Sequence, residues 1–223
     1  MKKIFLNWKQ NGSFNDIINF KNKLIQSEGV VLFTPSPYLY FASSNKFEVG
    51  SQNVSAFGNG AFTGEVGALM LKECGVRYCL VGHSERRTIF NEKEPELSSK
   101  IKLLKQVGIT PVLCVGENLE ERKSGKIFSK IQKQMEIFES GVLVAYEPVW
   151  SIGTGITAKE EEIAEVSSFM HQNYKIDVIY GGSVSSSNSK SILNIPHISG
   201  VLIGGASLKV DEVNKILNDN SRN

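Results

Sequence analysis

Cysteine is scarce in this sequence, and no segment has the length of a membrane span. The chain of 223 residues contains three cysteines, Cys74, Cys79 and Cys114, and no two of them form a CxxC pair. An odd number of scattered cysteines gives no disulfide framework and favours a reducing, cytoplasmic location. No apolar run approaches the roughly 20 residues that cross a bilayer, and the first run is too short for a signal peptide. We therefore expect a cytoplasmic protein that does not contact membranes.

An excess of charge of either sign is also lacking. The 25 lysines and arginines nearly balance the 23 acidic residues, which leaves a net charge of +2. The basic residues are scattered along the chain, with no basic run and no interleaved aromatic stripe. Such a weak and dispersed charge predicts no binding to nucleic acid or to an anionic membrane.

Several signatures of catalysis and cofactor binding are missing. His83, His171 and His197 are far apart and lack the HExxH spacing, so the sequence predicts no metal site. We interpret His171 and His197 as packed or surface residues. No GxGxxG follows the first apolar run and no GxSxG is present, which argues against a dinucleotide site and a serine hydrolase. We expect no cofactor.

Eight short apolar runs are present, and most are nearly continuous in valine, isoleucine and leucine. Continuous runs are typical of parallel strands that are buried on both faces. Helical patterns lie between them, and no linker or composition break divides the chain. The sequence therefore predicts one domain over residues 1–223, an α/β closed (β/α)₈ barrel, with a doubly wound open sheet as the alternative. The runs start near residues 2, 29, 47, 78, 109, 142, 177 and 200.

Three of the helical patterns are clear, and the last one carries a possible start signal. The first pattern contains Leu97, Ile101 and Leu104, the second contains Ile127, Ile131, Met135 and Phe138, and the third contains Ile163, Val166 and Met170. Thr157 with Glu160 fits a capping box before the third helix. Barrels of this kind usually have about 250 residues. We therefore expect shortened loops and helices, most visibly in residues 12–29 and 157–177.

Active sites of (β/α)₈ barrels lie where the strands end, and polar residues gather at those positions here. Glu147 ends a buried run directly before a glycine-rich loop. A carboxylate beside apolar walls loses hydration, which raises its pKa and makes it a better base. The alternative is a structural carboxylate that pairs with an arginine. His83 ends another run and precedes SER, which resembles a helix start, where a neutral imidazole is favoured. Lys9 follows Trp8 and can bind a phosphate or an oxyanion.

Two glycine pairs follow the last two runs, in YGGSV (residues 180–184) and IGGAS (residues 203–207). Glycine lets the backbone approach a ligand closely, and phosphate sites of these barrels commonly form from these two loops. Tight turns alone are the competing interpretation. Their position after the seventh and eighth runs favours a phosphate site.

Seven motifs together resemble the triosephosphate isomerase family: NWK, GAFTGE, VGHSERR, LCVGE, AYEPVWSIGTG, YGGSV and GVLIGGAS. They appear in the family's order and span nearly the whole chain. The resemblance implies a TIM barrel that interconverts dihydroxyacetone phosphate and D-glyceraldehyde 3-phosphate, an aldose–ketose isomerase of glycolysis and gluconeogenesis. It also implies a homodimer, in which Thr63 reaches the neighbour's site.

The resemblance also assigns site residues. Glu147 matches the base and His83 the group that polarises the enediol(ate) oxygens. Lys9 supplies positive charge beside Asn7, and Glu85 matches a further carboxylate of the site. The phosphate would be held by backbone N–H groups of Gly153, Ser183, Gly204 and Gly205, under a lid that contains Trp150, Ser151, Ile152 and Thr154.

The chain departs from the family pattern in places. Ser151 stands where alanine is usual, Ile156 where lysine is common at the lid hinge, and Gln10 where methionine is familiar. Cys114 is assigned to packing, because this chemistry needs no covalent intermediate. The alternatives are another phosphosugar barrel enzyme, or a catalytically silent barrel that binds phosphate metabolites.

Overall fold

The computed structural model of the chain describes residues 2–25, 28–44, 48–152 and 157–220. Its centre is a closed barrel of eight parallel strands in the order in which they occur along the chain. Closure is made by β1 pairing with β8, with Ile4 opposite Val201. The predicted barrel is confirmed, and the open sheet is excluded. The strands are β1 (Lys3–Asn7), β2 (Val30–Thr34), β3 (Glu48–Ser51), β4 (Val76–Val81), β5 (Thr110–Val115), β6 (Leu143–Tyr146), β7 (Val178–Tyr180) and β8 (Ile198–Ile203).

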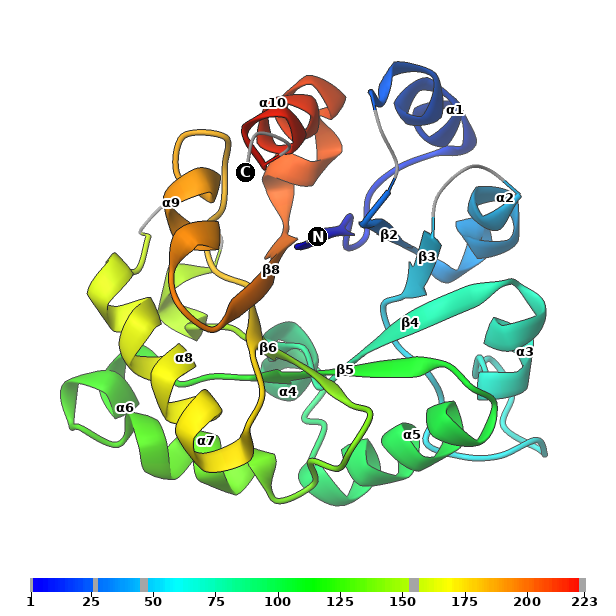
Figure 1. The fold of residues 1–223 in the computed structure, drawn as a ribbon. Helices are drawn as coiled ribbons and strands as arrows, with labels where there is room; N and C mark the ends of the chain where they lie inside the picture. The colour runs from blue at the N-terminus through cyan, green and yellow to red at the C-terminus, as the bar shows by residue number, and fades with distance from the viewer. Residues whose placement is uncertain (1, 26–27, 45–47, 153–156, 221–223) are drawn as a thin grey trace.

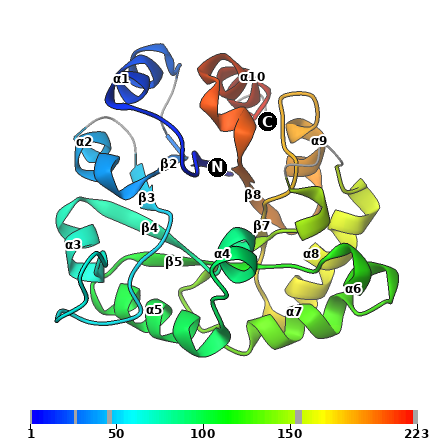
Figure 2. The same ribbon diagram turned by 180° about the vertical axis from the view of Figure 1, so that it is seen from behind.

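Helices surround the barrel, as both ribbon views show (Figures 1 and 2). Short 3₁₀ helices η1 (Ser36–Tyr38), η2 (Val149–Ser151) and η3 (Gly205–Leu208) lie in the loops after β2, β6 and β8. In the described part of the chain, no helix is both long enough and apolar enough to cross a membrane. The α-helices are α1 (Phe14–Lys23), α2 (Leu39–Ser43), α3 (Ala68–Glu73), α4 (Ser84–Ile89), α5 (Glu94–Gln106), α6 (Leu119–Lys123), α7 (Ile127–Met135), α8 (Glu160–Tyr174), α9 (Ser189–Asn194) and α10 (Val210–Asn220).

Two apolar cores explain why the strand sequences are nearly continuous. One core fills the barrel interior with side chains such as Phe5, Phe33, Cys114 and Leu202. The other lies between the strands and the helices, where Leu6 points away from Phe5 on the same strand. Since successive side chains of a strand point to opposite faces, both sets must be apolar. Cys114 lies in the inner core, which agrees with its assignment to packing.

Two details of the helices differ from the sequence-based expectation. Helix α8 begins at Glu160, and the backbone N–H of Lys159 donates to Glu162 Oε2 over 2.8 Å, so the predicted capping box from Thr157 to Glu160 is wrong. With 15 residues, α8 is the longest helix among the described residues. Helix α1, which lies in the other segment where shortening is expected, has 10 residues. Phe138 lies beyond the end of α7 and packs against the outer core.

Candidate active site

A cavity of about 400 Å³ opens at the carboxyl ends of the strands. The loops after β7 and β8 supply much of its wall, and the ends of β1, β4 and β6 supply its polar side chains. The structure thus brings together most of the residues that the sequence singled out. Those that line the cavity are Asn7, Lys9, His83, Glu147, Ile152, Ser183, Gly204 and Gly205.

Glu147 follows β6 directly and is buried, with 2% of its surface exposed. Its Oε2 accepts a hydrogen bond from the backbone N–H of Ser84 over 3.1 Å, and its Oε1 lies 3.3 Å from His83 Nε2. Its own backbone N–H donates to Val115 O over 2.7 Å. A Cβ on Gly116 would lie 1.9 Å from the Glu147 carbonyl oxygen, so only glycine permits this approach of the two strand ends. The carboxylate is therefore placed accurately by rigid backbone.

His83 is the N-cap of α4, which confirms the predicted helix start after it. Its Nδ1 accepts a hydrogen bond from the backbone N–H of Glu85 over 3.2 Å. A nitrogen that accepts from an N–H carries no proton, so the ring is a neutral imidazole whose proton is on Nε2. That nitrogen faces Glu147 and the cavity. The His83 ring can therefore donate a hydrogen bond to an oxygen bound there.

Lys9 has a left-handed backbone conformation, with φ of 53°. This conformation is uncommon for a residue with a side chain, and surrounding contacts must hold it. Asn7 Oδ1 accepts from the Lys9 N–H over 3.1 Å, and Gln52 Nε2 donates to the Lys9 carbonyl over 2.9 Å. The Lys9 ammonium lies 2.5 Å from Glu85 Oε1. Glu85 therefore belongs to the cluster through Lys9, although it does not itself line the cavity.

The opposite wall of the cavity is made mainly of backbone. Ser183 follows Gly181 and Gly182 in the loop after β7, and its hydroxyl donates to Ser151 O over 2.6 Å. Gly204 and Gly205 follow β8, and Gly205 is the first residue of η3. The first N–H groups of a helix have no partner within it, so this wall suits an anion.

The segment predicted as a lid is only partly described. Trp150 and Ser151 lie in η2, and Ile152 follows it. Trp150 Nε1 donates to Glu117 Oε1 over 3.0 Å, and the Ser151 side chain is fully buried against the loop after β7. Gly153, Thr154 and Ile156 lie outside the described residues.

Thr63 does not lie at the cavity of this chain. It is exposed in the loop between β3 and α3, close in sequence to Phe57 and Phe62. These two rings are also exposed and stack on each other, with centroids 4.4 Å apart.

Three polar residues after β7 that none of the sequence-based predictions includes belong to the same site. Ser185, Ser187 and Asn188 also line the cavity. Asn188 fixes this loop, because its Oδ1 accepts from the Ser185 N–H over 2.9 Å and its Nδ2 donates to Ser183 O over 3.0 Å. In the sequence, the serine-rich run SVSSSNS after YGG is the feature that indicates these polar residues.

Both buried cysteines have a raised thiol pKa. Burial, with the neighbouring Glu147 carboxylate, raises the pKa of Cys114 well above its ordinary value. Burial likewise raises the pKa of Cys79 to about 12. A thiol that stays protonated at neutral pH is a poor nucleophile, which agrees with a packing role.

Comparison with known proteins agrees with the geometry. The family model described as triosephosphate isomerase matches residues 2–220. This chain belongs to the triosephosphate isomerase family. It is 38% identical to the triosephosphate isomerase of Francisella tularensis subsp. holarctica (strain FTNF002-00 / FTA), over 98% of this chain and 97% of that protein. It is 39% identical to the triosephosphate isomerase of Mesomycoplasma hyorhinis, over 95% of each chain. The family resemblance of the seven motifs is thereby confirmed.

Proposed function

We propose that this protein interconverts dihydroxyacetone phosphate and D-glyceraldehyde 3-phosphate by proton transfer through an enediol(ate). Family membership over residues 2–220 supports the reaction. The observation that carries the proposal is the arrangement of Glu147 and His83 around one cavity, 3.3 Å apart, with the imidazole proton facing inwards. Lys9 adds a positive charge at the same cavity.

Glu147 is the base that moves the proton. Its carboxylate faces the cavity from a strand end and has only one hydrogen-bond donor from the backbone. It removes the proton from the carbon next to the carbonyl and returns it to the neighbouring carbon, which was the carbonyl carbon. An accurately placed base contributes through geometry as well as basicity.

His83 and Lys9 stabilise the charge that develops on the substrate oxygens. The neutral imidazole donates its Nε2 proton to these oxygens, and the Lys9 ammonium lies across the same cavity. Preorganised donors are effective here because they need no reorganisation during the reaction. Asn7 and Glu85 hold Lys9 in its left-handed conformation and orient its ammonium.

The substrate phosphate binds at the backbone wall that includes Ser183, Gly204 and Gly205, together with Gly153 of the lid. Trp150, Ser151, Ile152 and Thr154 form that lid, which excludes water from the enediolate and keeps it from losing phosphate. The bond from the Ser183 hydroxyl to Ser151 O supports a coupling between the phosphate wall and the lid.

We also propose that residues 1–223 form one domain, and that two copies form a homodimer in the cytoplasm. Exposed apolar side chains gather in and after the loop that carries Thr63, namely Phe57, Phe62, Leu69 and Met70. Exposed apolar surface of this kind is typical of a protein interface. In the dimer, Thr63 of one subunit would reach the active site of the other.

A coupled assay for glyceraldehyde 3-phosphate formation tests the proposed reaction. We expect turnover of dihydroxyacetone phosphate, and the same rate in a strong chelator because no metal takes part. A larger phosphosugar as the only substrate would favour the other phosphosugar enzyme. Substrate binding without turnover would favour the silent barrel. Reversible loss of activity in chelator would overturn the mechanism.

A further inference from the structure

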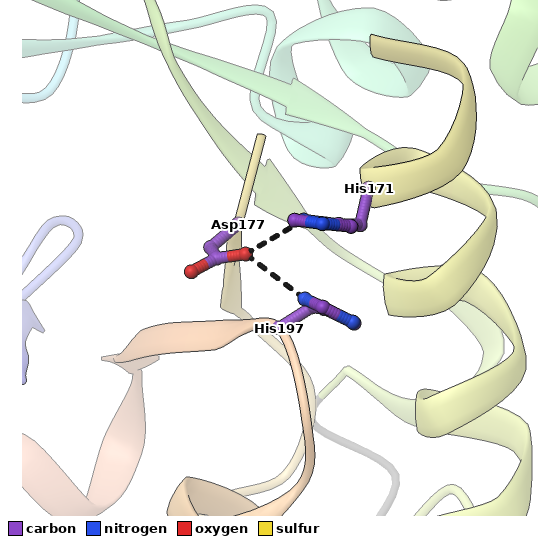
Figure 3. Close-up of side chains that lie close together, drawn as sticks. All are labelled: His171, Asp177 and His197. Atoms are coloured by element: carbon purple, nitrogen blue, oxygen red, sulfur yellow. Dashed lines mark hydrogen bonds and ion pairs between the residues drawn. The ribbon is translucent and has the colours of Figure 1, made fainter. Parts of the chain in front are cut away.

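A second cluster of polar side chains lies at the opposite end of the barrel from the cavity. His171, Asp177 and His197 converge there, as Figure 3 shows. Asp177 Oδ1 lies 3.2 Å from Nδ1 of His171 and 3.2 Å from Nδ1 of His197. In the described ranges, no other group of three histidine, cysteine or acidic side chains has ligand atoms this close together.

Strand register fixes two members of this cluster. Asp177 directly precedes β7 and His197 directly precedes β8, and the first residues of these strands, Val178 and Ile198, are paired. The backbone N–H of Val178 also donates to His197 O over 2.9 Å. Asp177 and His197 are therefore held side by side by the sheet itself.

The two imidazole rings are held in one orientation. His171 comes from the last turn of α8, and its ring stacks on that of His197 with centroids 3.7 Å apart and planes inclined by 20°. His197 has a left-handed backbone conformation, with φ of 63°. As a result both Nδ1 atoms point at the same oxygen of Asp177 (Figure 3).

We propose that His171, Asp177 and His197 bind a divalent transition-metal ion, with Zn²⁺ as the simplest example. Two ligands of one tetrahedral Zn²⁺, at bond lengths of about 2.0–2.2 Å, lie about 3.3–3.6 Å apart. The distances of 3.2 Å from the Asp177 oxygen to each imidazole nitrogen are close to this spacing, and all three ligand atoms lie within 4.8 Å of one another. Two imidazoles and one carboxylate suit zinc, copper or nickel rather than Mg²⁺ or Ca²⁺, which prefer six or more oxygens.

The three side chains are accessible to an ion from solvent, and the end of α8 favours a positive charge beside them. The side chains of His171, Asp177 and His197 are 43%, 50% and 33% exposed, so water can complete the coordination. The carboxyl end of α8, from which His171 comes, carries partial negative charge that attracts a cation. The positive charge of Lys2 opposes the binding of a cation, because it interacts with Asp177. Its ammonium, however, donates its hydrogen bonds to Leu193 O and Ile198 O.

A metal here would connect the end of α8 with the starts of β7 and β8, through ligands that are 6 and 20 positions apart along the chain. None of its ligands lines the catalytic cavity. The ion is therefore expected to stabilise the fold and to leave isomerase activity unchanged. Because an ion that binds only the folded state adds to its stability, zinc at 100 times its dissociation constant should raise Tm by about 5–10 °C.

The experiment is a zinc titration followed by imidazole ¹⁵N NMR and by thermal unfolding, on the untagged protein. The chain has three histidines, so the spectrum contains three rings. We expect zinc to shift the Nδ1 signals of His171 and His197, to leave His83 unchanged, and to raise Tm; Mg²⁺ should do neither.

Two variants locate the site. His197→Asn keeps a residue that tolerates positive φ, and His171→Gln changes an exposed helix position. Each should abolish the zinc-induced shifts and the rise in Tm. Cys74→Ser, the control for the partly exposed thiol, should keep both. The proposal is overturned if zinc leaves both rings unchanged in the wild-type protein, if it shifts His83 alone, or if both histidine variants respond like wild type.

Discussion

The carboxyl ends of β5 and β6 each carry a buried glutamate, and the two are held in opposite ways. Glu117, after β5, is 0% exposed, and Glu147, after β6, is 2% exposed. Glu117 Oε1 accepts from Arg122 over 2.9 Å, from Trp150 over 3.0 Å and from Tyr146 over 3.2 Å. Glu147 accepts from one backbone N–H and faces the cavity beside a neutral imidazole.

The difference is the one expected between a structural carboxylate and the base that we propose for the reaction. The charge of Glu117 is compensated by the Arg122 guanidinium, and its Oε1 accepts three hydrogen bonds, so its movement is restricted. Glu147 has no cationic side chain of that kind in hydrogen-bond contact within the described residues. Its carboxylate is therefore left open toward the cavity, as the proposed role of base requires. Burial alone does not distinguish the two roles; the partners do.

The largest expected effect is that of Glu147→Asp on turnover. Shortening the side chain withdraws the carboxylate by roughly 1 Å, and such a misplacement costs about 100-fold in rate. We expect kcat to fall by about that factor while KM changes little, in steady-state kinetics. The matched control is Glu117→Asp, which should cost less than tenfold in kcat. Equal losses in the two variants would remove the distinction between the glutamates.

The next effect is on stability, and it should fall on the other glutamate. Glu117→Gln leaves the Arg122 guanidinium without its buried partner, although Arg122 keeps an ion pair with Glu162 over 3.0 Å. We expect the free energy of unfolding to fall by about 2–3 kcal/mol, measured by urea denaturation. Glu139→Gln, which breaks the exposed pair with Lys105, should cost less than about 1 kcal/mol. A Glu117→Gln protein as stable as wild type would mean that the Arg122 pair is not structural.

The smallest expected effect is the reactivity of the thiol beneath Glu147. Since burial and that carboxylate raise the pKa of Cys114, its thiol stays protonated as the pH rises past the ordinary thiol pKa. At pH 8, iodoacetamide should label Cys74 and leave Cys79 and Cys114 unmodified in the folded protein, as mass spectrometry of digests would report. If Cys114 were labelled at a rate similar to that of Cys74, the raised pKa of the Cys114 thiol would be contradicted.

Much of this could be predicted from local sequence. The strands were predictable because both of their faces are buried, and Lys9, His83 and Glu147 because they end strands. Features that depend on two distant segments were not. The capping residues of α8 were misassigned because Glu160, Glu161 and Glu162 are consecutive and each fits a helix start. The left-handed conformation of Lys9 depends on Asn7 and Gln52, from two strand ends.

The partners of the two glutamates and the histidine pair were beyond the sequence for the same reason. Arg122 is close to Glu117 in the chain, but Tyr146 and Trp150 come from the neighbouring strand and its loop. His171 and His197 are brought together only by the packing of α8 beside β7 and by the register of β7 with β8.

The most direct test of the account is hydrogen exchange between dihydroxyacetone phosphate and deuterated water, followed by proton NMR. This measurement reports proton removal at the substrate carbon without requiring product release. We predict that Glu147→Gln slows the exchange by at least about 100-fold while Glu117→Gln exchanges at a rate near that of wild type. Exchange at the wild-type rate in Glu147→Gln would contradict the assignment of Glu147 as the base.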